Sequence, residues 1–275
     1  MTAASLEKTS GKVLETIKKW YSALSFPKKY DAEFEAALSN IYIPEDTKIE
    51  DYDVSCSDGK KNLLAVLYMC EAAERKFKSF GVPEKIILDT LSDIPIWCEN
   101  WSFVKSELYL GELEWLSLHL NAKIFRLGRL QFAIAGAKHR ISKYSVLLGD
   151  PVIEVHIPQG EKLTKEACDL SFEFAKDFFS KYFPSHKYKC FTCHSWLLDD
   201  TLRKYLSSES AILSFGDRFD RVHYDESYAL VRYIFPWDTT EENVKDREPI
   251  SSFAKRIKDA VLSGEKFYEV LGVII

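Results

Sequence analysis

Long apolar runs are missing from this 275-residue sequence, and none approaches the roughly 18 residues that cross a bilayer. The opening MTAASLEKTSGKVLETIKKWY has no apolar stretch after its first charges, so we expect no secretory signal. Lys and Arg number 37 against 42 Asp and Glu, with no block of like charge and no basic stripe. These absences disfavour a membrane protein and bulk nucleic-acid binding, and they predict a cytoplasmic protein with reduced thiols.

A second pair of closely spaced cysteines is also missing, which bears on the motif CFTCH at residues 190–194. This motif has the spelling of a c-type haem attachment site, and Cys-x-x-Cys pairs also bind zinc or carry out redox chemistry. The surrounding KYKCFTCHSWLL is rich in β-formers, and in a strand Cys190 and Cys193 would face opposite sides with Cα atoms about 10 Å apart. A disulfide needs about 7 Å or less. We therefore expect neither haem nor metal, and a redox or metal protein would rest on this motif alone.

Residues 11 to about 120 carry apolar side chains at the spacing of helical faces. Pro83 suits the first turn of one of these helices. The expected helical segments cover residues 13–24, 31–38, 62–77, 84–91 and 101–120. This half predicts a small helical bundle.

From Lys123 the pattern changes to short segments rich in β-branched and aromatic residues. The expected strands are IFRLGRLQFAIA, YSVLLGDPVIEVHI, KYKCFTCHSWLL, SAILSF and YALVRYIF. One strong helix is expected over residues 164–183, with Thr164 as its N-cap, and shorter helices over 200–206 and 251–262. An apolar tail, VLGVII, follows the last helix, and the chain contains no internal repeat.

The segment 158–164 joins a strand directly to the start of the strong helix. Free backbone N–H groups and the helix dipole make such a loop an anion site, and a phosphate could bind there. With the single glycine Gly160, an ordinary strand-to-helix turn is the alternative. The sequence alone leaves both interpretations open.

Alternation along the preceding strand places Glu154 and His156 on one face. Histidine has the intrinsic pKa for general base chemistry near neutral pH, although a histidine bonded within the core is an equal alternative. His194 shares a face with Thr192 and Trp196 in the next strand. If the two strands are parallel neighbours that diverge at their carboxyl ends, His156 and His194 flank one cleft.

Two arginines lie in the otherwise apolar IFRLGRLQF segment, where burial without a partner is costly. Arg129 and Gln131 share one face and Arg126 lies on the other. They either pair with acids such as Glu154 or contact an anionic group of a ligand.

The order of these elements resembles that of GNAT-type acyltransferases, which transfer acyl groups from coenzyme A thioesters to amines. The phrases IFRLGRLQF, VIEVHIPQGEKLT and CHSWLLDDTLRKYL are similar to a bacterial two-part family with a helical N-acyltransferase N-terminal domain and a GNAT-like C-terminal domain. The resemblance implies an α+β fold, with the helical domain at 1–120 and a mixed sheet flanked by helices at 121–275. It also implies a closing hairpin over residues 211–235.

As the resemblance implies, the chain is an acyl-CoA-dependent N-acyltransferase using acetyl-CoA or a longer acyl-CoA, with a small-molecule amine as acceptor. A catalytically inactive GNAT-like module that binds a metabolite or partner protein is the alternative. The usual pyrophosphate loop has the pattern Arg or Gln-x-x-Gly-x-Gly or Ala, from which this loop departs. The predicted base is His156 or Glu154, and the predicted acid is His194 or Tyr205. Residues expected to bind the coenzyme are Ile157, Gln159, Gly160, Glu161, Lys162, Leu163, Thr164 and Ser195, and those expected to bind substrate are Arg126, Arg129, Gln131 and Trp196.

Overall fold

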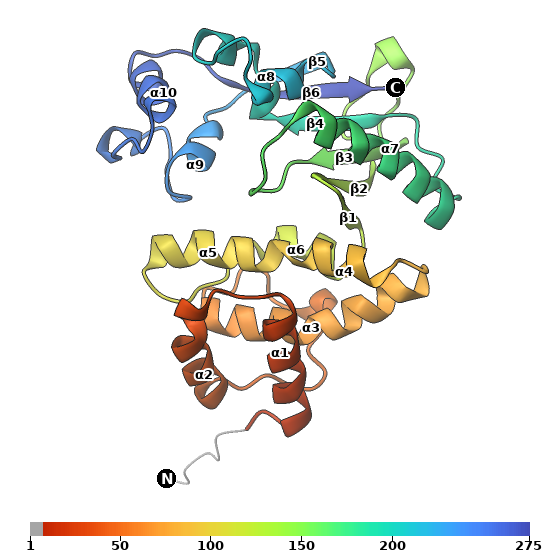
Figure 1. The fold of residues 1–275 in the computed structure, drawn as a ribbon, viewed down its shortest axis with the longest axis vertical. Coiled ribbons are helices and arrows are strands. Elements are labelled where there is room, and N and C mark those ends of the chain that lie inside the picture. The colour runs from red at the N-terminus through yellow and green to blue at the C-terminus, as the bar shows by residue number, and fades with distance from the viewer. Residues whose placement is uncertain (1–7) are drawn as a thin grey trace. The chain divides into compact units, whose positions relative to one another are not determined.

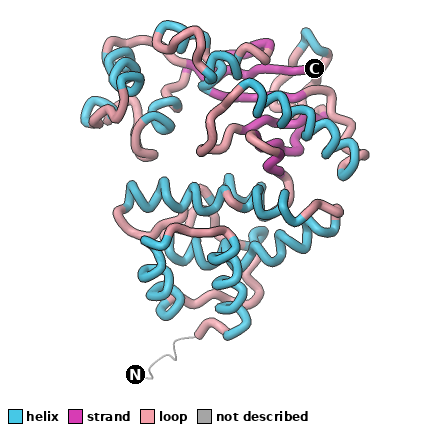
Figure 2. Tube along the Cα trace, in the orientation of Figure 1, coloured by secondary structure: helices cyan, strands magenta, loops and turns pink. Residues whose placement is uncertain are grey.

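The structure, a computed structural model, describes residues 8–275 (Figure 1). The chain divides into two compact units, with the division between Phe125 and Arg126. Figure 2 shows the first unit built of helices and loops, whereas the second combines helices with strands. The expected α+β class, a helical region followed by a mixed sheet flanked by helices, is confirmed.

Within residues 8–125, α3 is the central helix, and α1, α2, α4 and α6 pack against it. Its apolar residues are buried around most of its circumference, as expected for a helix enclosed by others. Side-chain caps fix two helix starts, since Ser10 accepts a hydrogen bond from the Val13 amide and Asp58 accepts one from the Lys61 amide. The helices of this unit are α1 (Gly11–Ala23), α2 (Asp31–Asn40), α3 (Gly59–Ser79), α4 (Glu84–Leu91), α5 (Asp93–Lys105) and α6 (Leu113–Leu120).

The predicted helical segment at 101–120 is interrupted, so the prediction was wrong for residues 106–112. Helix α5 ends before Ser106 and α6 begins after Glu112, and both of these residues have φ of 56° in the left-handed region. The linker is held in place because Asn62 donates hydrogen bonds to the carbonyls of Cys56 and Leu110. A tertiary contact of this kind overrides the helical periodicity of the sequence.

The strands of the described chain form one sheet with the order β1-β2-β3-β4-β6-β5. Strand β2 pairs antiparallel with β3, β3 pairs parallel with β4, and β6 lies antiparallel between β4 and β5. The mixed pairing follows from the connections, because the 18-residue helix α7 links the two parallel strands. The strands are β1 (Ile124–Leu127), β2 (Leu130–Gly136), β3 (Pro151–His156), β4 (Phe191–Ser195), β5 (Asp220–Glu226) and β6 (Tyr268–Ile274).

Helix α7 (Lys165–Tyr182) covers one face of this sheet (Figure 1). Its Phe172 ring makes edge contacts with Phe132 of β2, at 5.6 Å between ring centroids, and with Phe191 of β4, at 5.4 Å. The Thr164 side chain accepts a hydrogen bond from the Ala167 amide, as predicted for the N-cap. Because side chains alternate along a strand, the residues between those under α7 face the opposite side, which leaves that side for a site.

Two predicted strands are helices, so the predicted hairpin over 211–235 is wrong. SAILSF lies in α8 (Ala211–Gly216) and YALVRYIF in α9 (Leu230–Ile234). Leu213, Leu230 and Val231 enter one apolar cluster with α10 (Ser252–Leu262). Short apolar runs are compatible with a buried strand or a buried helix turn, and periodicity alone does not separate them.

The strands that replace the predicted hairpin come from segments to which no strand was assigned. Strand β5 reads DRVHYDE and lies at the edge of the sheet, where charged residues are common and obscure the apolar alternation. The apolar tail VLGVII belongs to β6, which lies between β4 and β5. The short helix predicted over 200–206 is a 3-10 helix, Asp200–Lys204.

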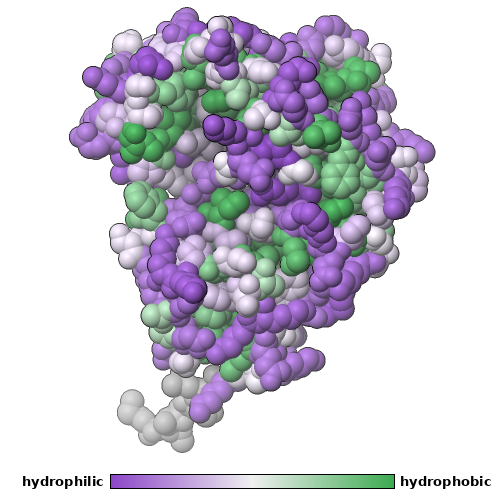
Figure 3. Space-filling model, in the orientation of Figure 1, coloured by the Kyte–Doolittle hydropathy of each residue, from purple (hydrophilic) through white to green (hydrophobic). Residues whose placement is uncertain are grey.

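Hydrophilic and hydrophobic residues alternate over the face of the molecule shown in Figure 3. In residues 8–275, no helix combines the length and the hydropathy needed to cross a membrane. The mixture agrees with a sequence of 46% hydrophobic and 29% charged residues.

Candidate active site

The parallel strands β3 and β4 separate toward their carboxyl ends. Their register holds only at Ile153 with Phe191 and at Glu154 with Thr192, although β3 continues to His156 and β4 to Ser195. The sequence-based expectation of diverging parallel strands is thus confirmed. Divergence opens the sheet on the side of the loop that leads into α7, which is where open α/β sheets bind ligands.

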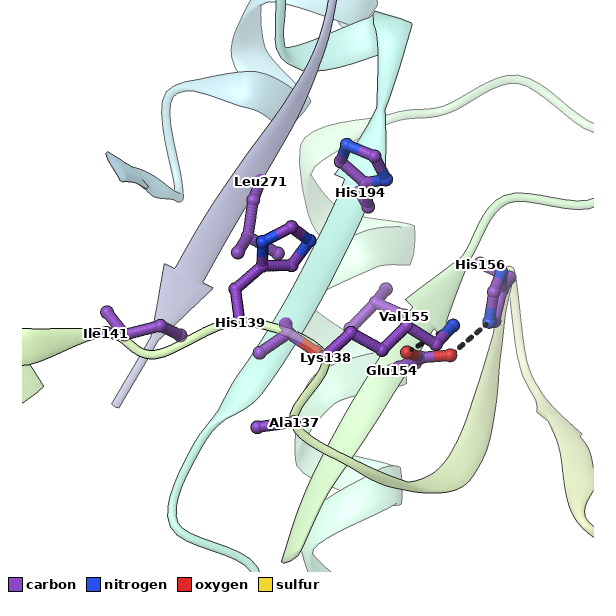
Figure 4. A pocket seen from close by; sticks show the side chains of 10 residues that line it. Ala137, Lys138, His139, Ile141, Glu154, Val155, His156, His194 and Leu271 are labelled. Carbon is purple, nitrogen blue, oxygen red and sulfur yellow. Dashed lines mark ion pairs between the residues drawn. The ribbon is translucent and has the colours of Figure 1, made fainter. Parts of the chain in front are cut away.

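A pocket of about 150 Å³ lies on the face of the sheet opposite α7 (Figure 4). Its walls come from the β2–β3 connection, from β3, from β4 and from β6. Both histidines predicted to flank a cleft line it, one on each of the separating strands. The lining residues are Ala137, Lys138, His139, Ile141, Glu154, Val155, His156, Thr192, His194 and Leu271.

Glu154 is ion-paired on both of its carboxylate oxygens (Figure 4). Lys138 Nζ lies 2.9 Å from Oε1 and His156 Nε2 lies 3.7 Å from Oε2. Burial alone raises the pKa of Glu154, but the contacts and charges of His156 and Lys138 outweigh burial and lower this pKa to about 2. A carboxylate with so low a pKa stays ionised at neutral pH and retains an abstracted proton poorly, so it is better suited to orienting an imidazole than to accepting protons.

His194 pairs with a carboxylate from the other end of the sheet. Its Nε2 lies 3.1 Å from Oδ2 of Asp225 on β5, and the second oxygen of Asp225 lies 3.1 Å from Nε2 of His223. Leu271 of β6 separates the two histidines, since it is the register partner of both His194 and His223. One carboxylate therefore bridges two imidazoles that stand on strands β4 and β5.

A third imidazole completes this group. The ring of His139, from the β2–β3 connection, lies 4.8 Å from the ring of His223 and 6.1 Å from that of His194. Sequence analysis did not single out His139, His223 or Asp225. The available signal was the spacing of His223 and Asp225, which places both on one face of a strand, but the charged β5 segment was not identified as a strand.

The loop between β3 and α7 lies at the other end of the opening. Gly160 has φ of 121°, a conformation that favours glycine, and residues 159–162 are exposed. Arg129 holds this loop in place, because its Nη1 donates a 2.9 Å hydrogen bond to the carbonyl of Pro158. The backbone amide of Arg129 donates to Ser171 Oγ of α7. The side chain is buried, with 7% exposure of the residue, and burial lowers its pKa.

The remaining predicted site residues occupy varied positions. Gln131 is the register partner of His156 on the pocket side, and Arg126 donates to the carbonyl of Gly128. Ser195 accepts a hydrogen bond from the Leu197 amide, and Trp196 packs beside the α9–α10 cluster. Tyr205 does not line the pocket.

The hydroxyl of Tyr205 donates instead to Glu265, and its ring packs against Phe267. Burial and the carboxylate of Glu265 raise the pKa of Tyr205. The structure thus brings Glu154, His156 and His194 together and leaves Tyr205 among other partners.

All six cysteines are free, and Cys190 and Cys193 are both buried. Cys193 stands in β4 and pairs in register with Gly272, as expected for an extended CFTCH segment. Burial raises the pKa of the Cys193 thiol. Over the part of the chain that the structure describes, no group of three or more His, Cys, Asp or Glu side chains is arranged to hold a metal ion.

Comparison with protein families divides the chain in two. An N-acyltransferase N-terminal domain model matches residues 11–122, and a GNAT-like C-terminal domain model matches residues 124–274, more than half of the chain. The chain belongs to the two-part N-acyltransferase family. The resemblance seen in the sequence is confirmed, and membership of this family makes the chain an acyltransferase with a GNAT-like catalytic fold.

Solved structures of acyltransferases share the fold of this N-acyltransferase family member. One, in complex with decanoyl-CoA and teicoplanin, has a TM-score of 0.78 and 18% identity, covering 99% of this chain and 90% of that chain. Another, in complex with decanoyl-CoA, has a TM-score of 0.77 and 22% identity over 98% of this chain and 90% of that chain. A third, in complex with CoA and 10C-teicoplanin, has a TM-score of 0.79 and 18% identity, covering 99% of this chain and 90% of that chain. No curated protein matches the sequence.

Proposed function

We propose that this chain transfers an acyl group from acyl-CoA to the amine of a small molecule. The observation that carries the proposal is the separation of β3 and β4 at their carboxyl ends, where the loop into α7 begins and where histidines of both strands line a pocket. Related folds with decanoyl-CoA and teicoplanin bound support both the class of donor and the class of acceptor.

The donor would enter through the loop at 158–164. The exposed residues 160–162 and the free N–H groups at the start of α7 supply donors for the pyrophosphate, and Lys162 adds a positive charge. Arg129 fixes the loop through Pro158. The pantetheine arm would then follow the opening between the strands, where unpaired strand edges offer backbone hydrogen-bonding groups, and deliver the thioester to the pocket.

Chemistry in the pocket requires two proton movements. The ammonium form of the acceptor loses one proton before it attacks, and the tetrahedral nitrogen loses a second as the C–N bond forms and the C–S bond breaks. The thiolate leaves with that second proton, and one proton goes to solvent. Holding the amine beside the thioester supplies much of the rate enhancement, and an imidazole base supplies a further factor of about 10² to 10⁴.

His194 is the proposed proton acceptor. Asp225 contacts its Nε2 at 3.1 Å, which leaves Nδ1 to accept a proton and stabilises the imidazolium that results. His156 has a weaker partner, because Glu154 lies 3.7 Å away and shares its charge with Lys138. His156, on the opposite wall, is the proposed hydrogen-bond donor to the departing sulphur.

Purified protein is to be mixed with decanoyl-, octanoyl- or acetyl-CoA and a panel of small amines that includes glycopeptide amines. We expect release of free CoA matched by an acylated amine of the calculated mass. His194→Ala and His156→Ala are each expected to lower turnover by about 10²-fold or more while acyl-CoA binding, followed by calorimetry, persists. Lys245→Ala, in a short helix, serves as the control.

One outcome would contradict this function, and another would contradict the roles given to the histidines. Binding of acyl-CoA without transfer to any amine would indicate an inactive GNAT-like module. Full turnover in both histidine variants would remove these side chains from proton transfer while leaving the acyltransferase activity in place.

A further inference from the structure

Asp225 stands outside the pocket lining, yet it holds two imidazoles that belong to different strands. Its Oδ2 contacts His194 and its Oδ1 contacts His223, each at 3.1 Å. The contact with His194 crosses β6, which separates β4 from β5, whereas His223 stands on β5 with Asp225. Because a neutral imidazole carries one N–H, a carboxylate that occupies Nε2 of His194 selects the tautomer with Nδ1 unprotonated.

We propose that Asp225 is the positioning residue for His194, and that His223 competes with His194 for the same carboxylate. The inference rests on the proposed function, in which His194 accepts the proton of the amine. In this arrangement Asp225 fixes the orientation and tautomer of His194, whereas His223 reduces the negative charge that Asp225 presents to His194.

The competition follows from the chemistry of a shared carboxylate. An N–H donated by His223 to Asp225 withdraws negative charge from the oxygen that faces His194, and a protonated His223 repels a protonated His194 directly. Burial raises the pKa of Asp225 and the charges and contacts of His223 and His194 outweigh it, so the pKa is lowered and the carboxylate stays ionised at neutral pH.

The other charged and titratable groups that face His194 are few. The ring of His139, from the β2–β3 connection, lies 6.1 Å from the ring of His194, and Lys138 lines the same pocket. Glu154 and His156 face the pocket from β3, but Glu154 is committed to Lys138 and His156. From β6, Glu269 is the register partner of Asp225 and accepts a hydrogen bond from Ser227.

His223 is held where the competition requires it. The His139 ring packs against the His223 ring at 4.8 Å with an interplanar angle of 36°. A histidine that merely capped the sheet edge would need neither the neighbouring ring nor the carboxylate. The edge strand thus contributes a second imidazole that tunes the first.

The two variants Asp225→Asn and His223→Ala are expected to change the tautomer of His194 in opposite directions. Removing the negative charge of Asp225 reduces the fraction of neutral His194 that carries its proton on Nε2, and removing His223 leaves Asp225 wholly to His194 and increases that fraction. Nitrogen nuclear magnetic resonance of the imidazole signals measures both changes, with the His194 signal identified by its loss in His194→Ala.

Kinetics provides the second readout. Asp225→Asn is expected to lower kcat by about tenfold. Glu226→Gln is the matched control, because Glu226 follows Asp225 on the same strand and pairs with Lys266 at 2.7 Å. It should leave both the His194 tautomer and kcat unchanged.

An unchanged His194 tautomer in Asp225→Asn, or changes in the same direction in both variants, would overturn this inference. That measurement does not depend on turnover. Failure of the wild-type protein to transfer any acyl group would overturn the proposed function, and the two failures are therefore distinguished.

Discussion

Asp93 lies in the interior of the helical unit, where two indoles and an imidazole meet one oxygen of its carboxylate. Trp115 Nε1 and Trp97 Nε1 donate to Oδ2 at 2.8 and 3.0 Å, and His119 Nε2 lies 3.3 Å from the same atom. The Asp93 and His119 side chains are 3% and 0% exposed. Burial raises the pKa of Asp93, but the hydrogen bonds and the charge of His119 outweigh burial and lower it.

His119→Ala is expected to lower the free energy of unfolding by about 3 kcal/mol, because it leaves a buried carboxylate without its imidazole and creates a void. Since the folded pKa of Asp93 is lowered, its contribution to stability is present above an unfolded pKa of about 3.9 and is lost as pH falls below that value. Urea unfolding of the wild type and variant between pH 3 and 7 measures both effects.

The part of the free energy of unfolding that depends on pH should be smaller in His119→Ala than in the wild type. Lys85→Ala is the control, since Lys85 pairs with Asp89 on the exposed surface of α4 and should cost less than about 0.5 kcal/mol. A His119→Ala effect as small as that of the control would show that the buried network contributes nothing.

Site residues were predictable where one segment carried both the strand pattern and the functional side chains. Glu154, His156 and His194 stand in strands whose apolar alternation marks their orientation, and all three line the pocket. Asp225 and His223 were missed because their charged segment was not identified as a strand, and the contact of Asp225 with His194 crosses an intervening strand and leaves no local pattern. The proton-transfer roles of these side chains stay predictions.

At the level of elements, β6 is the strand that joins β5 to the rest of the sheet. It lies between β4 and β5, and its Gly272 faces Phe219 and Leu198 at close range. A Cβ at Gly272 would lie 2.6 Å from Cβ of Phe219 and 2.7 Å from Cδ1 of Leu198. Glycine at this position allows the sheet to approach the segments that follow β4 and α8.

Gly272→Ala is expected to destabilise the protein by about 1 to 3 kcal/mol, because the added methyl group has no room without displacing the Phe219 backbone or the strand. Thermal unfolding compared with the wild type measures the change. Gly11→Ala is the matched control, since nothing lies within 4 Å of its Cβ position at the start of α1. That control should be neutral or slightly stabilising, and equal effects of the two substitutions would contradict the steric argument.

Elements with a long periodic pattern were predictable, and elements in short apolar runs were not. The amphipathic pattern and N-cap of α7 identified it almost to the residue, whereas α8 and α9 were taken for strands. Each of these two helices has six residues or fewer, too short for a 3.6-residue period to become visible. Their state is decided by packing against α10, which is remote in the sequence.

At the scale of the whole molecule, the chain has two compact units, and each family model matches one side of the junction near residue 123. The order of helical region and mixed sheet was predictable because composition changes there from helical periodicity to β-rich segments. We propose that the domains follow the predicted division at residue 120. The arrangement of the site within the sheet was beyond sequence analysis, because it depends on the β6 pairing.

Calorimetry tests this division in the full-length protein. Two unfolding transitions are expected, and decanoyl-CoA at about 100 times its Kd should stabilise the transition of the second unit by about 2.7 kcal/mol while leaving the other in place. Assignment of the transitions follows from His119→Ala, which lowers the first unit's transition. A single transition that shifts as a whole would show that the units unfold together.

The position of β6 in the sheet also dictates when the site can form. In register, Cys193 of β4 pairs with Gly272 of β6 and His223 of β5 pairs with Leu271, so these partners are 79 and 48 residues apart in the chain.

Such long-range pairing makes assembly of the site a late event in folding, because the ends of long loops must meet before β6 can pair. A nascent chain that has emerged from the ribosome only as far as α10 already contains His194, Asp225 and His223, yet it lacks the strand that holds β4 beside β5. Until β6 emerges, the carboxylate and its imidazoles have no common scaffold. During synthesis the chain is therefore expected to stay catalytically silent until residues 268–274 have been translated.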